Sequence, residues 1–192
     1  MTQVNNSEEI SAVKIKSAAD YISLAITTFG VGYLPLAPGT WGSLAGIGIY
    51  LIFRWFETNL ASNFVSGGFS ASQITAWIHI GNLIIFLLFC LLGIWASNRA
   101  TVLFGNEDPP QAVVDEIIGQ ILTFFFVPLA ISGWMIFAGF ALFRLFDIWK
   151  PYPIDALQNL HGGLGICADD ILAGVYAGTG LLLIYALSIT FF

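Results

Sequence analysis

Charged side chains are scarce in this chain. They make up 9% of its 192 residues, whereas a soluble domain carries roughly 25%. Hydrophobic residues account for 57% of the sequence, and the mean hydropathy is +0.84. So few charges cannot cover the surface of a domain of this size in water. The composition therefore predicts a protein whose main solvent is a lipid bilayer.

Basic residues, histidines and cysteines are also few. Six lysines and arginines against twelve acids leave a net charge of −6, which excludes nucleic acid as an expected partner because its binding needs a basic surface. Nothing in the sequence indicates an obligatory protein partner. His79 and His161 are too few for a zinc site. Cys90 and Cys167 lie far apart without metal-site spacing, so we interpret both as packing residues.

Apolar segments dominate the rest of the chain. The segment 74–96 has the length of roughly 20 residues that a helix needs to cross a hydrocarbon core. Four more apolar segments, some of them short, are 43–56, about 113–128, 134–149 and 171–192. A further stretch, 21–36, is broken by glycine and proline and indicates an interfacial or re-entrant helix.

Helices are the expected structure of these segments. A chain in lipid must satisfy its backbone hydrogen bonds internally, and the alternating pattern of barrel strands is absent. The sequence therefore predicts an all-α, multi-pass membrane protein with about five apolar helices. We expect one domain over residues 21–192, after a flexible polar tail over residues 1–20.

The polar clusters of the sequence stand at the ends of the apolar segments. If each segment crosses the membrane once, the clusters near residues 38–43, 113–119, 143–154 and 161–175 all lie on one face. Five of the six basic residues lie on that face too: Lys14, Lys16, Arg99, Arg144 and Lys150. By the positive-inside rule, this face is predicted to be cytoplasmic.

Five of the twelve acids occupy these helix ends, where ionisable side chains are costly and usually functional. They are Asp147 and two adjacent pairs, Asp115–Glu116 and Asp169–Asp170. A single acid at a helix start is explained as a cap, but two pairs are harder to explain in that way. Neighbouring helical residues diverge by about 100°, so each pair suits one metal ligand and one supporting acid. Carboxylates without nitrogen or sulfur partners favour Mg²⁺ or Mn²⁺, and all four paired acids are candidate ligands.

The segment 134–149 and the residue after it supply the basic groups. Arg144 and Asp147 are three residues apart and share a helix face, and Lys150 lies three residues further on. Arg144 can neutralise Asp147, which leaves Lys150 free. An arginine and a lysine beside paired acids are the groups expected in a phosphate site bridged by a metal.

The stretch PGTWGS, residues 38–43, begins an apolar segment. A glycine-rich turn at a helix N-terminus points backbone N–H groups outward and lets an anion approach closely. Taken alone, this stretch is explained as an ordinary helix start. Because it lies on the same face as the acids and basic residues, it predicts a phosphate cradle. The candidate phosphate-binding residues are Gly39, Thr40, Gly42, Ser43, Arg144, Lys150 and His161.

Four ordered stretches resemble the phosphatidylglycerophosphatase A family of bacterial lipid phosphatases. They are LPLAPGTWGSL, VVDEIIG, FRLFDIWKPYPI and HGGLGICADDILAGV, and together they span about residues 32–175. The resemblance implies an all-helical protein of the bacterial inner membrane. It also implies Mg²⁺-dependent removal of the terminal phosphate of phosphatidylglycerophosphate, a membrane phospholipid, during phospholipid biosynthesis.

The chemistry of the residues assigns roles within that reaction. One acid of each pair is expected to hold Mg²⁺, while Arg144 and Lys150 neutralise the phosphoryl group. Asp147 orients Arg144 or acts as general base or nucleophile, so attack by water and a phospho-aspartate both stay open. The predicted catalytic residues are Asp147, Arg144, Lys150 and Asp170.

Other classes of protein fit less well. The PSGH block of histidine-based lipid phosphatases and the DGxxAR block of CDP-alcohol transferases are missing. A small transporter or channel subunit could use the acids as an ion path, but they lie at helix ends rather than in the middle of a span. A purely structural membrane subunit leaves the two acid pairs unexplained.

Overall fold

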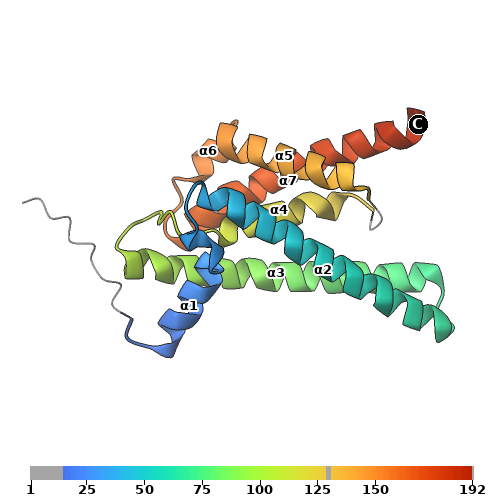
Figure 1. Ribbon diagram of the computed structural model, residues 1–192, viewed down its shortest axis with the longest axis horizontal. Coiled ribbons are helices and arrows are strands. Elements are labelled where there is room, and N and C mark those ends of the chain that lie inside the picture. Colours follow the sequence, from blue (N-terminus) through green and yellow to red (C-terminus); the bar gives the residue numbers. More distant parts are fainter. Residues whose placement is uncertain (1–14, 129–130, 192) are drawn as a thin grey trace, which may run out of the picture.

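The fold is all helical in the part of the chain that the structure, a computed structural model, describes: residues 15–128 and 131–191. Seven α-helices and two short 3₁₀ helices occur there (Figure 1). They are α1 (Ala18–Thr28), η1 (Val31–Tyr33), α2 (Pro38–Ser66), α3 (Ala71–Phe104), α4 (Val114–Thr123), η2 (Phe124–Phe126), α5 (Gly133–Trp149), α6 (Ile154–Leu157) and α7 (Gly163–Phe191). The predicted all-α fold in a single domain is confirmed.

The start of α1 corrects the predicted polar tail. Ser17 caps the helix by accepting a hydrogen bond from the backbone N–H of Asp20, and the Asp20 carboxylate accepts one from the backbone N–H of Ser17. This reciprocal capping box satisfies two donors that the helix itself leaves free. Residues 18–20 are therefore helical, and Asp20 is buried. Residues 1–14 of the predicted tail lie outside the described residues.

Helices α2 and α3 form a long antiparallel hairpin (Figure 1). With 29 and 34 residues, they are roughly 43 and 51 Å long at 1.5 Å per residue. The predicted apolar segments 43–56 and 74–96 are shorter than the helices that contain them. An apolar run shows where a helix contacts the core or lipid, and it does not show where the helix ends. Helix α2 continues through polar residues to the turn at Gly67 and Gly68, where Gly68 adopts φ +86°.

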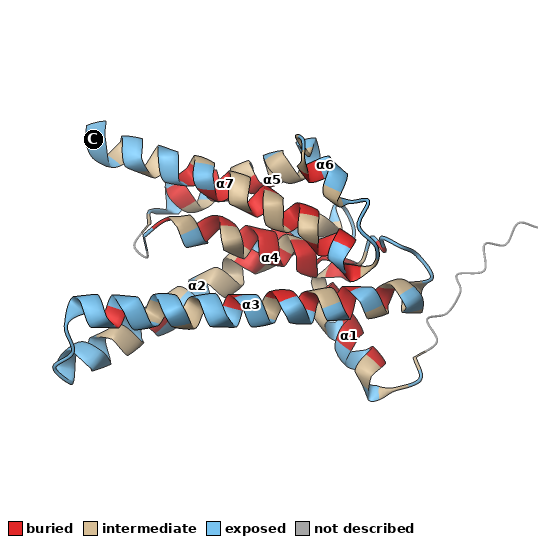
Figure 2. Ribbon diagram, turned by 180° about the vertical axis from the view of Figure 1, so that it is seen from behind, coloured by how far each residue is buried: buried red, intermediate tan, exposed pale blue. Residues whose placement is uncertain are grey.

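The short helix α4 lies at the centre of the fold and packs against α2 and α7. Figure 2 shows α4 as mostly buried, whereas the outer face of α3 and the end of α7 are exposed. Two glycines allow α4 and α7 to cross closely. A Cβ atom on Gly119 would lie 2.5 Å from the Asp170 carbonyl oxygen, and one on Gly174 would lie 2.5 Å from the Gly119 carbonyl oxygen. This crossing brings the acids at the two helix starts together.

Two helices of the described chain, α3 and α7, are long and apolar enough to cross a membrane. Only 22% and 28% of their apolar windows are buried, so neither resembles the enclosed core helix of a soluble protein. Helices α4 and α5 have 10 and 17 residues, fewer than the roughly 20 that a crossing takes. Whether about five helices enter the bilayer therefore stays a prediction.

The polar helix ends gather at one end of the bundle (Figure 1). The N-termini of α2, α4 and α7 lie there with the C-termini of α3 and α5, and the α2–α3 turn lies at the opposite end. The expected grouping of the polar clusters is thus present in the structure, and it positions the candidate site.

Candidate active site

A polar cavity of about 670 Å³ lies at this end of the bundle. Its walls come from α3, α4, α5, α7 and the residues that follow α3, α5 and α6. Seven of the predicted site residues line it: Asp115, Glu116, Asp147, Lys150, His161, Asp169 and Asp170. The sequence therefore identified most of the ionisable lining of this cavity.

Three carboxylates form a compact trio in the cavity. Asp115, Glu116 and Asp170 each offer an oxygen, and these oxygens all lie within 4.8 Å of one another. Asp115 Oδ1 and Glu116 Oε2 are buried and accept no hydrogen bond from any described residue. Three acids so close repel one another unless a cation lies between them. An all-oxygen donor set with two unpartnered buried oxygens fits a hard divalent cation such as Mg²⁺.

The pKa values at the start of α4 reflect the same crowding. Burial raises the pKa of Asp115 well above its usual range, and the neighbouring charges of Glu116 and Asp170 raise it further. Burial also raises the pKa of Glu116. Both members of this pair belong to the trio, whereas the sequence predicts only one ligand per pair. Adjacent helical residues point about 100° apart. The longer side chain of Glu116 lets its carboxylate reach the trio despite this divergence.

Asp169 has different partners from Asp170. Lys150 Nζ donates a hydrogen bond to Asp169 Oδ2 at 2.6 Å, and Gln158 Nε2 donates to the same oxygen at 3.1 Å. The other oxygen, Asp169 Oδ1, accepts from the backbone N–H of Asp170 at 3.1 Å. In this second pair Asp170 joins the trio, while Asp169 holds a lysine.

The sequence predicts that Lys150 is free of an acidic partner, but the structure pairs it with Asp169. Lys150 follows the last turn of α5 in the left-handed conformation, with φ 45° and ψ 55°, and Pro151 comes next. Burial lowers the pKa of Lys150, but the hydrogen bond to Asp169 and the charges of the surrounding aspartates outweigh it, so the net pKa is raised. The lysine is thus a firmly protonated group at the cavity wall.

Arg144 and Asp147 form the predicted pair along α5. Arg144 Nη1 lies 2.6 Å from Asp147 Oδ2, and both side chains are largely buried. Arg144 also adjoins the start of α2. A Cβ atom on Gly39 would lie 3.0 Å from Arg144 Nη1 and would overlap Glu116 Oε1. The first turn of α2 therefore lies against both a basic and an acidic residue of the site.

The glycines of α2 have a packing role. A Cβ atom on Gly42 would lie 2.9 Å from Val113 Cβ, and one on Gly46 would lie 3.0 Å from Gln120 Cβ. Gly39, Gly42 and Gly46 share one helix face, since they are spaced three and four residues apart. Their small size lets α2 approach α4 closely, a function that the cradle interpretation did not include.

The hydroxyl residues of the predicted cradle do not cap α2. Ser43 is fully buried and donates its hydroxyl hydrogen to the Gly39 carbonyl oxygen at 2.9 Å. The N-cap residue is Ala37, which offers no side-chain hydrogen bond. Thr40 is half-buried. None of the described residues that line the cavity comes from the 39–43 stretch. This stretch adjoins the site through Gly39, next to Glu116 and Arg144.

Sequence reasoning missed Gln158, which lines the cavity and holds Asp169. A lone glutamine in a loop has no spacing or periodicity that could have indicated its role. The two cysteines, in contrast, behave as predicted. Cys90 and Cys167 are buried and unpaired by disulfide, with Cys167 Sγ 3.9 Å from Ser97 Oγ.

Comparison with known proteins places the chain in a family. The family model of phosphatidylglycerophosphatase A matches residues 24–185. Phosphatidylglycerophosphatase A of Escherichia coli K12 is 32% identical over 176 residues, which cover 91% of this chain and 89% of that protein. The Haemophilus influenzae Rd protein of the same name is 34% identical over 173 residues, covering 88% of this chain and 91% of that protein.

A third relative carries a different name. A Bacteroides thetaiotaomicron protein, provisionally named phosphatidylinositol-3-phosphatase, is 36% identical over 152 residues, covering 79% of this chain and 85% of that protein. No solved structure matches the chain. The family match and the similarity of full-length relatives agree with the four sequence stretches, and the chain belongs to the phosphatidylglycerophosphatase A family of phosphatases.

Proposed function

We propose that this protein hydrolyses phosphatidylglycerophosphate to phosphatidylglycerol and phosphate, as a step of phospholipid biosynthesis. The observation that carries the proposal is the carboxylate trio of Asp115, Glu116 and Asp170 beside the basic residues Lys150 and Arg144. The names of two relatives support the choice of substrate. A transporter or channel subunit is not favoured, because the acids gather in one cavity at a bundle end and the family is one of phosphatases.

The cofactor that we propose is Mg²⁺, held by the trio. The support is the two buried oxygens of Asp115 and Glu116 that no described residue satisfies. A bound ion of this kind supplies charge stabilisation at phosphoryl oxygens and a water molecule of lowered pKa. Asp115, Glu116 and Asp170 would hold such an ion through their carboxylate oxygens.

The remaining residues of the site act on the substrate. Lys150 and Arg144 supply positive charge for the phosphoryl oxygens, where charge-assisted hydrogen bonds are strongest. Asp169 and Gln158 orient Lys150, and Asp147 orients Arg144. His161 lines the same cavity and is a further candidate contact of the phosphate. Asp147 also lies where it could accept a proton or act as nucleophile.

The membrane placement that we propose follows from the two candidate spans. With α3 and α7 across the bilayer, the cavity lies at one membrane face together with Arg99, Arg144 and Lys150. The positive-inside rule makes that face cytoplasmic, and the family's bacterial relatives support an inner-membrane location. The phosphate of a lipid in the inner leaflet would then lie at the level of the cavity.

Phosphate release from purified, detergent-solubilised protein tests this function. We expect phosphatidylglycerophosphate to give the highest kcat/KM, a chelator to abolish turnover, and added Mg²⁺ to restore it. Phosphatidylinositol 3-phosphate should be assayed in parallel because one relative's name includes it. A higher kcat/KM for that lipid would change the substrate assignment, and the absence of turnover on both lipids would overturn the proposal.

A further inference from the structure

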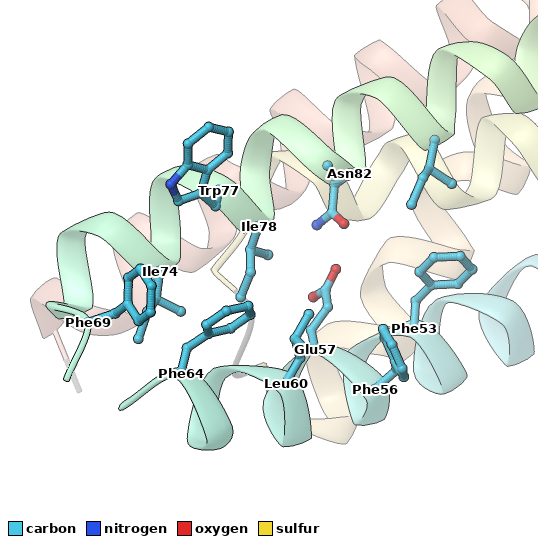
Figure 3. A pocket seen from close by; sticks show the side chains of 12 residues that line it. Phe53, Phe56, Glu57, Leu60, Phe64, Phe69, Ile74, Trp77, Ile78 and Asn82 are labelled. Carbon is cyan, nitrogen blue, oxygen red and sulfur yellow. The ribbon is translucent and has the colours of Figure 1, made fainter. Parts of the chain in front are cut away.

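A second pocket lies between α2 and α3, close to the turn that joins them (Figure 3). It measures about 450 Å³, within the range of roughly 300–1,000 Å³ that is usual for ligand pockets. The lining is mostly aromatic and aliphatic, with Phe53, Phe64 and Ile74 among the residues around it. Along α2 it lies about 18 residues beyond Gly39, or roughly 27 Å from the active site.

One carboxylate interrupts this apolar lining. Glu57 is only 6% exposed, and its Oε2 has no hydrogen-bond partner among the described residues. Arg54 Nη1 lies 3.8 Å away, close enough for an ion pair but beyond hydrogen-bonding distance, and it too has no hydrogen-bond partner among the described residues. Figure 3 shows the carboxylate pointing across the pocket toward Asn82 of α3. A buried acceptor without a donor is costly, so the pocket suits an occupant that brings N–H or O–H groups.

The surroundings of the pocket indicate a lipid. Helix α3 is one of the two candidate membrane spans. Trp55 and Trp77, near this end of the hairpin, are both 69% exposed, as expected for aromatic residues at a membrane–water interface. A molecule that reaches this pocket therefore comes from the bilayer, with its chain along the aromatic wall and its head group near Glu57.

The charges narrow the class of lipid. An anionic head group would face the Glu57 carboxylate and be repelled. The positive charge of Arg54 and the negative charge of Glu57 cancel, so the pocket carries no net charge from this pair. Such a pocket suits a lipid head group without net charge. A quaternary ammonium group is cationic but has no N–H to donate, whereas a primary ammonium group supplies both charge and donors.

We propose that this pocket binds a zwitterionic membrane lipid with a primary ammonium head group. The ammonium donates hydrogen bonds to Glu57 Oε2 and to the amide oxygen of Asn82, and one acyl chain packs against the aromatic residues of α2 and α3. The site lies far from the catalytic cavity, so this binding does not depend on the proposed phosphatase function.

Native mass spectrometry of the purified full-length protein tests the proposal. The protein is titrated with phosphatidylethanolamine and, separately, with phosphatidylcholine of the same acyl chains, which differs only in its quaternary nitrogen. We expect wild-type protein to retain the ethanolamine lipid about tenfold more tightly, an increment of about 1.4 kcal/mol. Glu57→Gln should reduce this preference below about twofold, because the charge is lost while the shape is kept. Asn59→Ala, on the exposed surface of α2, is the control and should keep it.

A second variant tests the pocket without changing a charge. Gly81 lines the pocket, and a Cβ atom placed on it would meet no other atom within 4 Å. Gly81→Leu therefore adds bulk at the pocket and should weaken retention of both lipids. Equal retention of the two lipids by wild-type protein would overturn the proposal, as would an unchanged preference in Glu57→Gln. If Glu57→Gln does not fold, wild-type retention by Gly81→Leu would overturn it instead.

Discussion

Lys150 and Asp169 form an ion pair across the active-site cavity, with 2.6 Å between Lys150 Nζ and Asp169 Oδ2. The lysine follows the end of α5 and the aspartate belongs to the first turns of α7. The pair therefore fixes these helix ends relative to each other. Asp170, the next residue, then points to Asp115 and Glu116, so two adjacent acids contact different partners.

The first prediction separates those two acids. Asp170→Asn removes a proposed metal ligand, and we expect the Mg²⁺ concentration for half-maximal turnover to rise at least tenfold. Asp169→Asn loosens Lys150 and should lower kcat by about 10–100-fold, the usual effect of a residue that orients a ligand or catalytic group, with little change in Mg²⁺ dependence. Phosphate release measured against Mg²⁺ concentration distinguishes the two outcomes. An identical shift in Mg²⁺ dependence for both variants would contradict the division of roles.

The second prediction concerns the stability of the carboxylate trio. Binding of an ion to the folded protein alone raises its melting temperature, so Mg²⁺ should stabilise the wild-type protein. Asp115→Asn should abolish this increase, because one ligand is lost. In a chelator the same variant should melt no earlier than wild type, since one of three repelling charges has been removed. A large loss of stability in the chelator would instead show that Asp115 acts as a structural helix-start residue.

The third prediction uses the capping box of α1. The backbone N–H of Lys16, followed by Arg99 and Ser17, lowers the pKa of Asp20 from 3.8 to about 2. Because the folded-state pKa is depressed, this stabilisation is complete above about pH 4 and is lost as the pH falls toward 2. Asp20→Asn should therefore melt earlier than wild type at pH 7 and close to it at pH 2. A gap in melting temperature that does not narrow on acidification would refute this assignment.

The sequence predicted the role of a residue well where that role depends on contacts within one helix or on the order of the segments. Apolar content predicted the all-α membrane fold, and the spacing of Arg144 and Asp147 predicted their ion pair. The grouping of helix ends followed from alternating chain direction. Each of these inferences needs only local periodicity and the order of the segments.

Contacts between distant segments were harder to predict. The close approach of Gly39 to Glu116, and of Gly119 to the backbone of α7, depends on how helices cross. The pairing of Lys150 with Asp169 depends on the left-handed turn after α5. Neither the crossing of two helices nor the direction of a turn produces a periodic pattern in the sequence. The glycines at the start of α2 are also equally compatible with an anion cradle.

The fourth prediction tests the membrane orientation. Single cysteines replace Asn106, Asn159 or Ser66 in a protein that carries Cys90→Ala and Cys167→Ala. All three positions are exposed; Asn106 and Asn159 lie at the active-site end and Ser66 lies at the α2–α3 turn. In intact cells, an impermeant thiol reagent should modify only the cysteine at position 66. Modification at position 106 before cell lysis would place the active site outside the cytoplasm.

The last prediction concerns the first turn of α2, where helix packing and phosphate binding make different demands. Gly39→Ala brings a Cβ atom onto Glu116 Oε1 and to 3.0 Å from Arg144 Nη1, so turnover should fall sharply. Gly48→Ala is the matched control, because its Cβ would meet no other atom within 4 Å, and its turnover should stay at the wild-type level. Equal losses in both variants would show only a general intolerance of α2 to added bulk.

Thr40→Val then tests phosphate binding at this turn, because it keeps the shape of the side chain and removes the hydroxyl. Because the Thr40 hydroxyl does not cap α2, its removal should leave the melting temperature close to that of wild type. Loss of a hydrogen bond to the transition state costs about 3 kcal/mol, a rate effect of around a hundredfold. We expect this loss of kcat with an unchanged melting temperature, both measured on the same preparation. A variant that turns over normally would make this turn a packing element, and the phosphate would then depend on Arg144, Lys150 and the metal.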